Sequence, residues 1–231
     1  MKERIIDPAN DNVPAISRKA KSRDADIPEA VVRRLPRYFR YLRELINSSD
    51  VLRVSSADLA KGLDISPSQV RQDLGCIGQT GQQGYGYGVI QLYNKISETL
   101  GVRCRFSAVL ITARATAGIV SDMAVFEQRG VRLKAVFSLD GEEGTLCGLD
   151  ITGIEGLDAF IQNEGADIAV VAVDEDRLDT VCGIIRGKGF GGVLNYSQRE
   201  LHEKDIGCPV QNVCCVDPLM LLTYSMSENL K

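Results

Sequence analysis

Residues 55–89 combine two short helix patterns, a tight turn and a glycine-rich tail, and this combination restricts the fold more than any other segment. The pair Ser55-Ser56 can cap a helix that runs to Leu63, because a serine hydroxyl accepts a hydrogen bond from an unpaired N–H at a helix start. Ser66 can cap a second helix with Pro67 at its first position, where the missing N–H costs nothing. The sequence therefore predicts a helix-turn-helix.

The second of these helices has an apolar and a polar face. Val70 and Leu74 recur with helical spacing and are expected to point into the core. The opposite face carries hydroxyl, amide and guanidinium groups, which read base edges in the major groove of DNA. The predicted DNA-reading residues are Ser66, Ser68, Gln69, Arg71 and Gln72. An ordinary solvated helix face is the alternative interpretation.

Glycine alternates with glutamine and tyrosine directly after this helix, in the stretch GQTGQQGYGYGV. Such a composition suits a short hairpin with positive-φ turns that lies close to a nucleic-acid backbone. Two tyrosines at a two-residue spacing favour a strand over a flexible linker, which is the alternative. The predicted wing residues in contact with DNA are Gln82, Gln83, Tyr85 and Tyr87.

An arginine-rich helix is predicted upstream, opening at Ile27-Pro28-Glu29. Its apolar residues recur with helical period and leave the arginines on the outside. Pro36 is expected to kink or restart this helix, because its ring removes a hydrogen bond. Beside a helix-turn-helix, the exposed Arg33, Arg37 and Arg40 are interpreted as phosphate contacts, with a solvated surface as the alternative.

The charge distribution separates the two halves of the chain. Residues 1–100 contain 15 Lys/Arg and 12 Asp/Glu, net +3, and the remainder contains 12 and 19, net −7, which gives the overall −4. A weakly positive DNA-binding half on an acidic chain implies that binding depends on placement and dimer symmetry more than on bulk attraction. The sequence has no apolar run long enough to span a bilayer and no signal-peptide core, so we expect a cytoplasmic protein without membrane contact.

From about residue 104, short β-rich runs alternate with helical patterns. The runs 108–111, 133–137 and 168–173 are apolar without strict alternation, as parallel strands covered on both faces are. This βαβ series predicts an α/β fold class, in which a Rossmann-like parallel sheet follows the N-terminal winged helix. A Rossmann domain also leaves a nicotinamide-dependent oxidoreductase as a further interpretation, although no nucleophile or paired acid accompanies the single histidine, His202.

The turn after the first Rossmann strand departs from the usual dinucleotide fingerprint. That turn needs glycines so that backbone N–H groups can approach the pyrophosphate. Here the candidate cofactor-binding residues are Thr112, Ala113, Arg114, Ala115, Thr116 and Ala117. An acid that receives the ribose hydroxyls is expected at the end of the second strand. Ser138 occupies that place, and Asp140 follows two residues later.

From Ile27 to Ser225 the chain resembles the Rex family of bacterial redox-sensing repressors. The matching motifs are RLPRYFRYL, SSADLA, SQVRQDL, GQQGYGYGV, FEQRG and the final 217–224 helix. This resemblance implies a homodimer that binds palindromic operator DNA and releases it when NADH binds between the Rossmann domains. It also implies that the helix at 216–227 is exchanged between subunits.

The resemblance and the residue patterns together give four segments. We expect a disordered arm at 1–26, a winged helix at 27–100, a Rossmann-like sensor at 101–215 and a dimerisation helix at 216–231. Three departures from the family lie where the ligand is expected: the changed turn, Ser138 in place of the ribose acid, and Asp174 in the loop after the fourth strand, where the family usually has a proline. They leave open a Rex-like repressor that has lost NAD(H) sensing and responds to thiol oxidation or another ligand.

Seven cysteines without CxxC spacing make a metal site unexpected. Cys208, Cys214 and Cys215, just before the C-terminal helix, are candidate redox thiols, and Cys76 follows the predicted reading helix. Most of the cysteines are otherwise expected to be small buried apolar side chains.

Overall fold

The computed structural model describes residues 27–82, 84–113, 126–141, 144–146, 148–214 and 217–228. The predicted arm at 1–26 lies outside these ranges. The chain divides into two compact units, Met1–Arg105 and Phe106–Lys231. Within the described ranges, no helix has both the length and the apolar character needed to cross a membrane.

The first unit is a small helical domain with a two-stranded sheet. Its elements are α1 Glu29–Ser48, β1 Arg53–Val54, α2 Ser56–Leu63, α3 Pro67–Cys76, β2 Tyr87–Gly88 and α4 Val89–Thr99, followed by the 3-10 turn η1 Val102–Cys104. The core lies between α1 and α4, where the Phe39 and Tyr93 rings stack at 4.9 Å. Val70 and Leu74 of α3 are fully buried in the same core, so the predicted apolar face of the reading helix is confirmed.

Helix α1 runs without interruption through Pro36, so the expected restart at this proline does not occur. The Pro36 side chain is exposed. Its missing N–H leaves the carbonyl of Val32, four residues earlier, on the solvent side of the helix, where Val32 is 39% exposed. Water can satisfy that carbonyl, which explains why the helix tolerates the proline.

The second unit is built on a seven-stranded sheet in the order β5-β6-β4-β3-β7-β8-β9. The strands are β3 Phe106–Thr112, β4 Val131–Ser138, β5 Thr145–Leu146, β6 Leu149–Gly153, β7 Ile168–Ala172, β8 Gly192–Asn195 and β9 Val210–Asn212. All neighbouring pairs are parallel except β5 with β6. Apart from the antiparallel edge strand β5, this is the strand order of a doubly wound Rossmann sheet.

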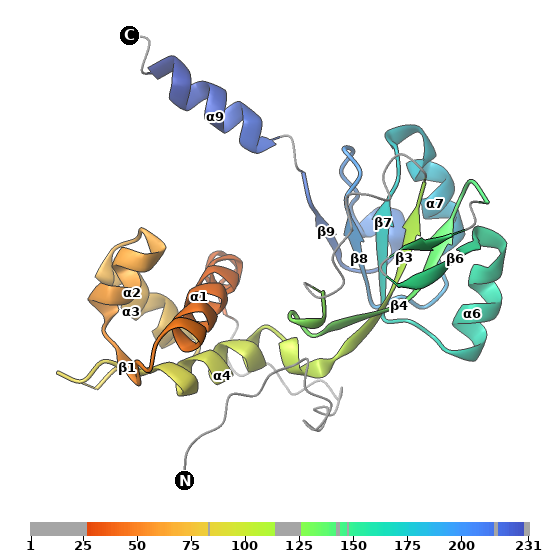
Figure 1. The fold of residues 1–231 in the computed structure, drawn as a ribbon. Helices are drawn as coiled ribbons and strands as arrows, with labels where there is room; N and C mark the ends of the chain where they lie inside the picture. Colours follow the sequence, from red (N-terminus) through yellow and green to blue (C-terminus); the bar gives the residue numbers. More distant parts are fainter. Residues whose placement is uncertain are drawn as a thin grey trace. The chain divides into compact units, whose positions relative to one another are not determined.

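The second unit also contains helices and 3-10 turns. They are η3 Ile154–Gly156, α6 Leu157–Asn163, η4 Glu175–Arg177, α7 Leu178–Ile185, α8 Glu203–Ile206 and α9 Asp217–Glu228. The helices α6 and α7 lie against one face of the sheet (Figure 1). Val109, Ile111, Ala169 and Val171 point to that face, and Leu110 and Val170 point to the other. The apolar strands are therefore buried on both faces, as predicted.

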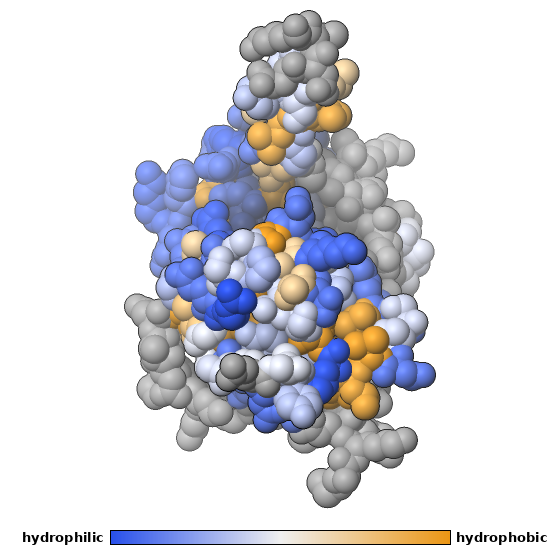
Figure 2. Space-filling view, turned by 90° about the vertical axis from the view of Figure 1, so that its left-hand side faces the viewer, coloured by the Kyte–Doolittle hydropathy of each residue, from blue (hydrophilic) through white to orange (hydrophobic). Residues whose placement is uncertain are grey.

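Helix α9 differs from the other helices because every described side chain from residue 217 to 227 is exposed. Its large apolar side chains are between 55% and 69% exposed, and they are Leu219, Met220, Leu221, Leu222, Tyr224 and Met226. Figure 2 shows hydrophobic side chains on this helix at the top of the view. The helix thus presents apolar surface to solvent in a single chain.

Candidate nucleic-acid interface and ligand crevice

The helix-turn-helix is fixed by two serine caps. Ser55 Oγ accepts from the backbone N–H of Asp58 at 3.1 Å, and the Asp58 carboxylate accepts in return from the N–H of Ser55. The Ser55 hydroxyl donates to the Asp58 carboxylate at 2.6 Å, and this bond together with the one from the Ser55 N–H lowers the pKa of Asp58. Ser66 Oγ accepts from the N–H of Gln69 at 3.1 Å, and Pro67 is the first residue of α3. Both caps and both helix starts agree with the sequence analysis.

The N-terminal half of α3 presents its polar residues to solvent. Ser66, Ser68, Arg71 and Gln72 are exposed, and Gln69 is half-buried. Arg71 donates to Ser56 Oγ at 3.1 Å, so its guanidinium lies beside the start of α2. In helix-turn-helix proteins the N-terminal residues of the second helix contact base edges. The five predicted DNA-reading residues therefore share one accessible part of this helix.

A buried carboxylate lies behind this accessible face. Asp73 is 0% exposed, and Arg34 of α1 holds both of its oxygens, from Nε at 2.8 Å and from a terminal nitrogen at 2.7 Å. Tyr38 Oη donates to Oδ2 at 3.1 Å, and Gln69 Nε2 donates to Oδ1 at 2.8 Å. Burial alone would raise the pKa of Asp73, but the hydrogen bonds from Arg34, Gln69 and Tyr38 outweigh burial and lower it.

Arg34 and Asp73 were not predicted from the sequence as functional residues. One signal was available, because Asp73 lies between the core positions Val70 and Leu74 and a carboxylate on the buried side of a helix requires a partner. The partner itself was not predictable from spacing, since Arg34 is 39 residues away.

The wing is a tight hairpin closed by Gln82 and Gly86. The N–H of Gln82 donates to the carbonyl of Gly86 at 3.1 Å, and the N–H of Gly86 donates back at 3.0 Å. The strand β2 then pairs antiparallel with β1, which joins the wing to the helical core. The predicted hairpin is confirmed, whereas Gln83 lies outside the described residues.

The two wing tyrosines have opposite environments, which corrects one prediction. Tyr85 is 71% exposed and available to a ligand, but Tyr87 is 7% exposed and belongs to the core of the first unit. Gly86 lies between them with a φ of +67°, and this left-handed residue breaks the alternation that would place both rings on one face. Tyr87 therefore anchors the wing instead of contacting DNA.

Arg53 of β1 holds the wing in place and was also missed from the sequence. Its guanidinium donates to the carbonyls of Tyr85 at 2.8 Å and Gly86 at 3.1 Å, and to Gln82 Oε1 at 3.1 Å. It lies 5.9 Å from the centre of the Tyr85 ring. A hollow of about 680 Å³ lies between the wing and the helices, lined in part by Arg53, Arg71 and Tyr85.

The three predicted phosphate-contacting arginines of α1 have different surroundings. Arg33 forms an exposed ion pair with Glu29 at 2.7 Å. Arg37 donates to the carbonyl of Leu63 at the end of α2, which is a structural contact within the domain. Arg40 is exposed. The three arginines therefore do not form a uniform row along α1.

The second unit has its candidate crevice at the carboxyl ends of β3, β4 and β7, where the strand order reverses. Thr112 and Ser138 are fully buried there, and Ala113 is 2% exposed. The N–H of Leu139 donates to the carbonyl of Thr112 at 3.1 Å, which ties the ends of β3 and β4 together. The other predicted turn residues, Arg114, Ala115, Thr116 and Ala117, lie outside the described residues.

Neither candidate ribose-binding residue offers an unpaired carboxylate. Ser138 Oγ accepts from the N–H of Asp140 at 3.1 Å. The Asp140 carboxylate forms an ion pair with Arg177 of η4, and this contact raises the pKa of the arginine. The loop after β4 is thereby connected to the loop after β7, where Asp174 is exposed. A ribose at this place would meet a hydroxyl and an ion-paired acid.

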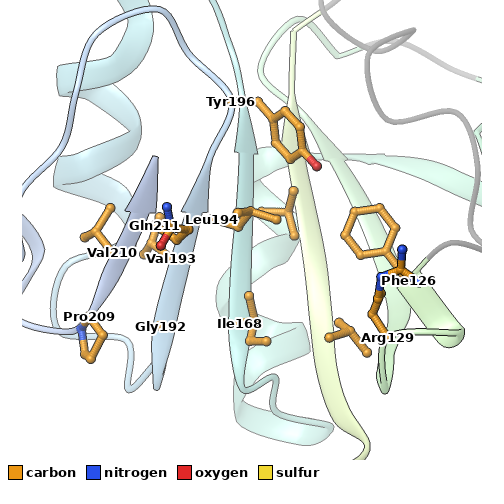
Figure 3. Close-up of a pocket in the computed structure, with 12 residues that line it drawn as sticks. Phe126, Arg129, Ile168, Gly192, Val193, Leu194, Tyr196, Pro209, Val210 and Gln211 are labelled. Atoms are coloured by element: carbon orange, nitrogen blue, oxygen red, sulfur yellow. The ribbon is translucent and has the colours of Figure 1, made fainter. Parts of the chain in front are cut away.

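An apolar groove of about 510 Å³ lies on the sheet face opposite α6 and α7. Figure 3 shows Phe126 and Arg129 at one end, Pro209 and Val210 at the other, and Ile168 and Leu194 between them. Tyr196 lies beside the same groove. This groove and α9 are two apolar surfaces in the described part of the unit.

Cys208, one of the three candidate redox thiols, lies in an environment that disfavours its thiolate. Burial raises the pKa of Cys208 and that of Cys182, and a raised pKa lowers the fraction of reactive thiolate at neutral pH. Cys214 is half-buried, and Cys215 lies outside the described residues.

In the described part of the chain, no three His, Cys, Asp or Glu side chains converge as metal ligands do. His202 is exposed and precedes α8, where its N–H donates to Asp205 at 2.9 Å.

The N-terminal unit also matches a known family model. Residues 26–75 match the family described as "Putative DNA-binding protein N-terminus". A winged helix-turn-helix joined to a Rossmann-type sheet defines the class of two-domain transcription regulators.

Relatives covering nearly the whole chain identify the family. The chain is 36% identical over 207 residues to the redox-sensing transcriptional repressor Rex of Caldicellulosiruptor bescii, covering 89% of this chain and 94% of the relative. It is 35% identical to that of Clostridium novyi, covering 87% and 96%. The chain therefore belongs to the Rex family of redox-sensing transcriptional repressors, a family of repressors and not of enzymes.

Solved structures agree with this assignment. The crystal structure of RSP in complex with beta-NAD+ and operator DNA has a TM-score of 0.78 and 30% identity, covering 89% of this chain and 94% of that one. The crystal structure of RSP in complex with beta-NADH has a TM-score of 0.76 and 28% identity, covering 89% and 96%. Both units of this chain thus have counterparts in a Rex-family repressor.

Proposed function

We propose that this protein is a homodimeric repressor that binds palindromic operator DNA in the cytoplasm and releases it in response to NADH. The observation that carries the DNA-binding part is the exposed start of α3, with its Ser66 cap, beside a wing that Arg53 holds in place. In this arrangement α3 enters the major groove and Tyr85 lies against the adjacent backbone. The RSP complex with operator DNA supports the same use of this fold.

The homodimer is supported by α9 and the family resemblance. Six large apolar side chains of α9 are exposed, and an apolar patch of this kind marks an interaction surface. A second copy covers this surface in the proposed dimer, and two DNA-binding units then contact the two halves of a palindrome. Sedimentation of the protein should give the mass of a dimer, whereas Leu222→Asp should give a monomer that binds the operator more weakly.

NAD(H) is the proposed effector because the family is redox-sensing and RSP is solved with both beta-NAD+ and beta-NADH. The place for the ligand is the crevice at the carboxyl ends of β3, β4 and β7. Thr112, Ala113, Ser138 and Asp140 are the described candidate residues at these strand ends, and the first three are buried. Bound there, NADH reports the redox state of the nicotinamide pool. The role of this chain is to convert its binding into a changed dimer geometry.

One observation favours a second candidate function. The acid expected for the ribose is replaced by buried Ser138, and the nearby Asp140 is already ion-paired with Arg177. Such a pocket favours a repressor of the same fold that has lost or changed its effector.

A single titration separates the two functions. Fluorescence anisotropy would follow the protein binding to a palindromic operator of Rex type at one fixed salt concentration, with and without excess NADH. Release of DNA by NADH supports the sensor of the nicotinamide pool. Tight binding that NADH does not change supports a repressor with an altered effector. If the protein binds no operator with or without NADH, the proposed repressor function is contradicted.

A further inference from the structure

We propose that buried Asp73 is a positioning residue that sets which bases Gln69 can recognise, and that Gln69 accordingly selects adenine. This inference rests on the proposed binding of DNA by α3. Gln69 is the third residue of α3 and half-buried, in the part of the helix nearest to base edges. Asp73 is one helical turn further along the same helix.

The contact between the two side chains can form in only one orientation. A carboxylate is purely a hydrogen-bond acceptor, whereas a carboxamide has a donating nitrogen and an accepting oxygen. Gln69 Nε2 therefore faces Asp73, to which it donates at 2.8 Å. A flipped carboxamide would place its oxygen against a negative charge. The Gln69 oxygen is consequently directed away from the carboxylate.

The hydrogen bonds to Asp73 prevent its carboxylate from rotating and oppose its protonation, which would turn it into a donor. Arg34 binds both carboxylate oxygens, and Tyr38 Oη donates to Oδ2. The two bonds from Arg34 keep the group ionised and fix its plane. The oxygen that faces Gln69 is Oδ1, and the oxygen that faces Tyr38 is Oδ2. The orientation of Gln69 is thus determined by α1 as well as by α3.

This orientation has a consequence for base recognition. In the major groove, adenine and cytosine present an amino donor, whereas guanine and thymine present acceptors. An outward carboxamide oxygen accepts from an amino group. The second N–H of Gln69 can donate to N7 of adenine, a group that cytosine lacks. The geometry therefore favours adenine, then cytosine, over guanine and thymine at the base pair that Gln69 contacts.

The experiment begins with selection of operators from a random duplex pool by the wild-type protein. Gln69→Ala then locates the relevant base pair, because the preference at that pair should disappear. At the same pair, Asp73→Asn should reduce the preference for adenine over guanine by about tenfold, since an asparagine nitrogen can donate and lets the Gln69 carboxamide turn over. Preferences at the other base pairs should remain.

Tyr38→Phe is the matched control. It removes one hydrogen bond from Oδ2 and leaves the contact between Oδ1 and Gln69 in place. Loss of stability without a change in base preference is expected. Ratios between duplexes are compared within each variant, so a partly unfolded population lowers all affinities equally and leaves the ratios intact.

Three outcomes would overturn the inference. The first is an Asp73→Asn variant that weakens binding to every duplex by the same factor, which is what a purely structural role of Asp73 predicts. The second is a Gln69→Ala variant that retains the preference at every base pair. The third is a wild-type protein that selects no duplex at all, and this outcome alone also overturns the proposed function.

Discussion

The guanidinium of Arg53 donates to the backbone carbonyl of Tyr85 at 2.8 Å, so the first strand of the DNA-binding unit supports the tip of the wing. Two further hydrogen bonds, to Gly86 and Gln82, come from the same side chain. Since the wing has only a two-residue strand, β2, side-chain contacts determine its position to a large extent.

Arg53→Ala should weaken operator binding by about tenfold, because a wing without these three hydrogen bonds must be ordered when DNA binds. Arg53→Lys keeps the positive charge but not the planar fork, and it should lose most of the same affinity. Anisotropy titrations at one salt concentration would measure both. If lysine restored wild-type affinity, charge and not wing support would be the function of Arg53.

Gly86→Ala should be much more damaging than Gly84→Ala. Both glycines have positive φ, +67° and +77°, so each alanine costs about 1–2 kcal/mol of backbone strain. A Cβ at Gly86 would also lie 2.3 Å from the backbone oxygen of Val54, whereas a Cβ at Gly84 meets no atom within 4 Å. Thermal unfolding and operator titrations of the two variants should therefore differ, and equal effects would contradict the described hairpin.

The contribution of Asp73 to stability should disappear in acid. Its pKa in the folded protein is below the ordinary value of 3.8, so the stability it contributes is present above that value and is lost as the pH falls through the folded pKa. Removing one partner of a buried pair costs roughly 3 kcal/mol. Urea unfolding of wild type and Asp73→Asn should show a clear difference at about pH 7 that shrinks below about pH 4. A constant difference would contradict an ionised Asp73.

Ser138→Asp should raise the affinity for NADH by about tenfold, because a carboxylate at the end of β4 can accept from both ribose hydroxyls. It can still accept from the N–H of Asp140, as Ser138 does at 3.1 Å. Ser138→Ala is the control, since it removes the hydroxyl without adding an acceptor, and no gain is expected. Calorimetric titration with NADH would measure all three proteins. Equal affinity of Ser138→Asp and wild type would mean that the ribose lies elsewhere.

Local signals predicted the framework of the DNA-binding unit well. Serine caps, a proline at a first helical position and helical periodicity act within a few residues, so α2 and α3 begin where Ser55 and Ser66 indicate. The parallel sheet was also predictable, because strands buried on both faces are continuously apolar. The two-residue strand β5 and the edge strand β9 had no comparable pattern.

Interactions between distant residues were not predictable in the same way. Tyr87 was wrong as a DNA contact because alternation assumes regular strand geometry, and the positive φ of Gly86 interrupts it. Arg37 lies on the outer face as its spacing predicts, but its guanidinium is used by the Leu63 carbonyl of another helix. Only the folded arrangement of α1 against α2 and α3 reveals such contacts.

Helix α9 has a consequence for how the protein behaves at different expression levels. It has 12 residues, and an isolated helix of that length is marginal in water. In the proposed homodimer, the ordering of α9 depends on association, and association follows mass action. Dilution should therefore lower the fraction of chains in which α9 is helical. A cell with few copies of the repressor should hold a larger share of chains with an unfolded C-terminus.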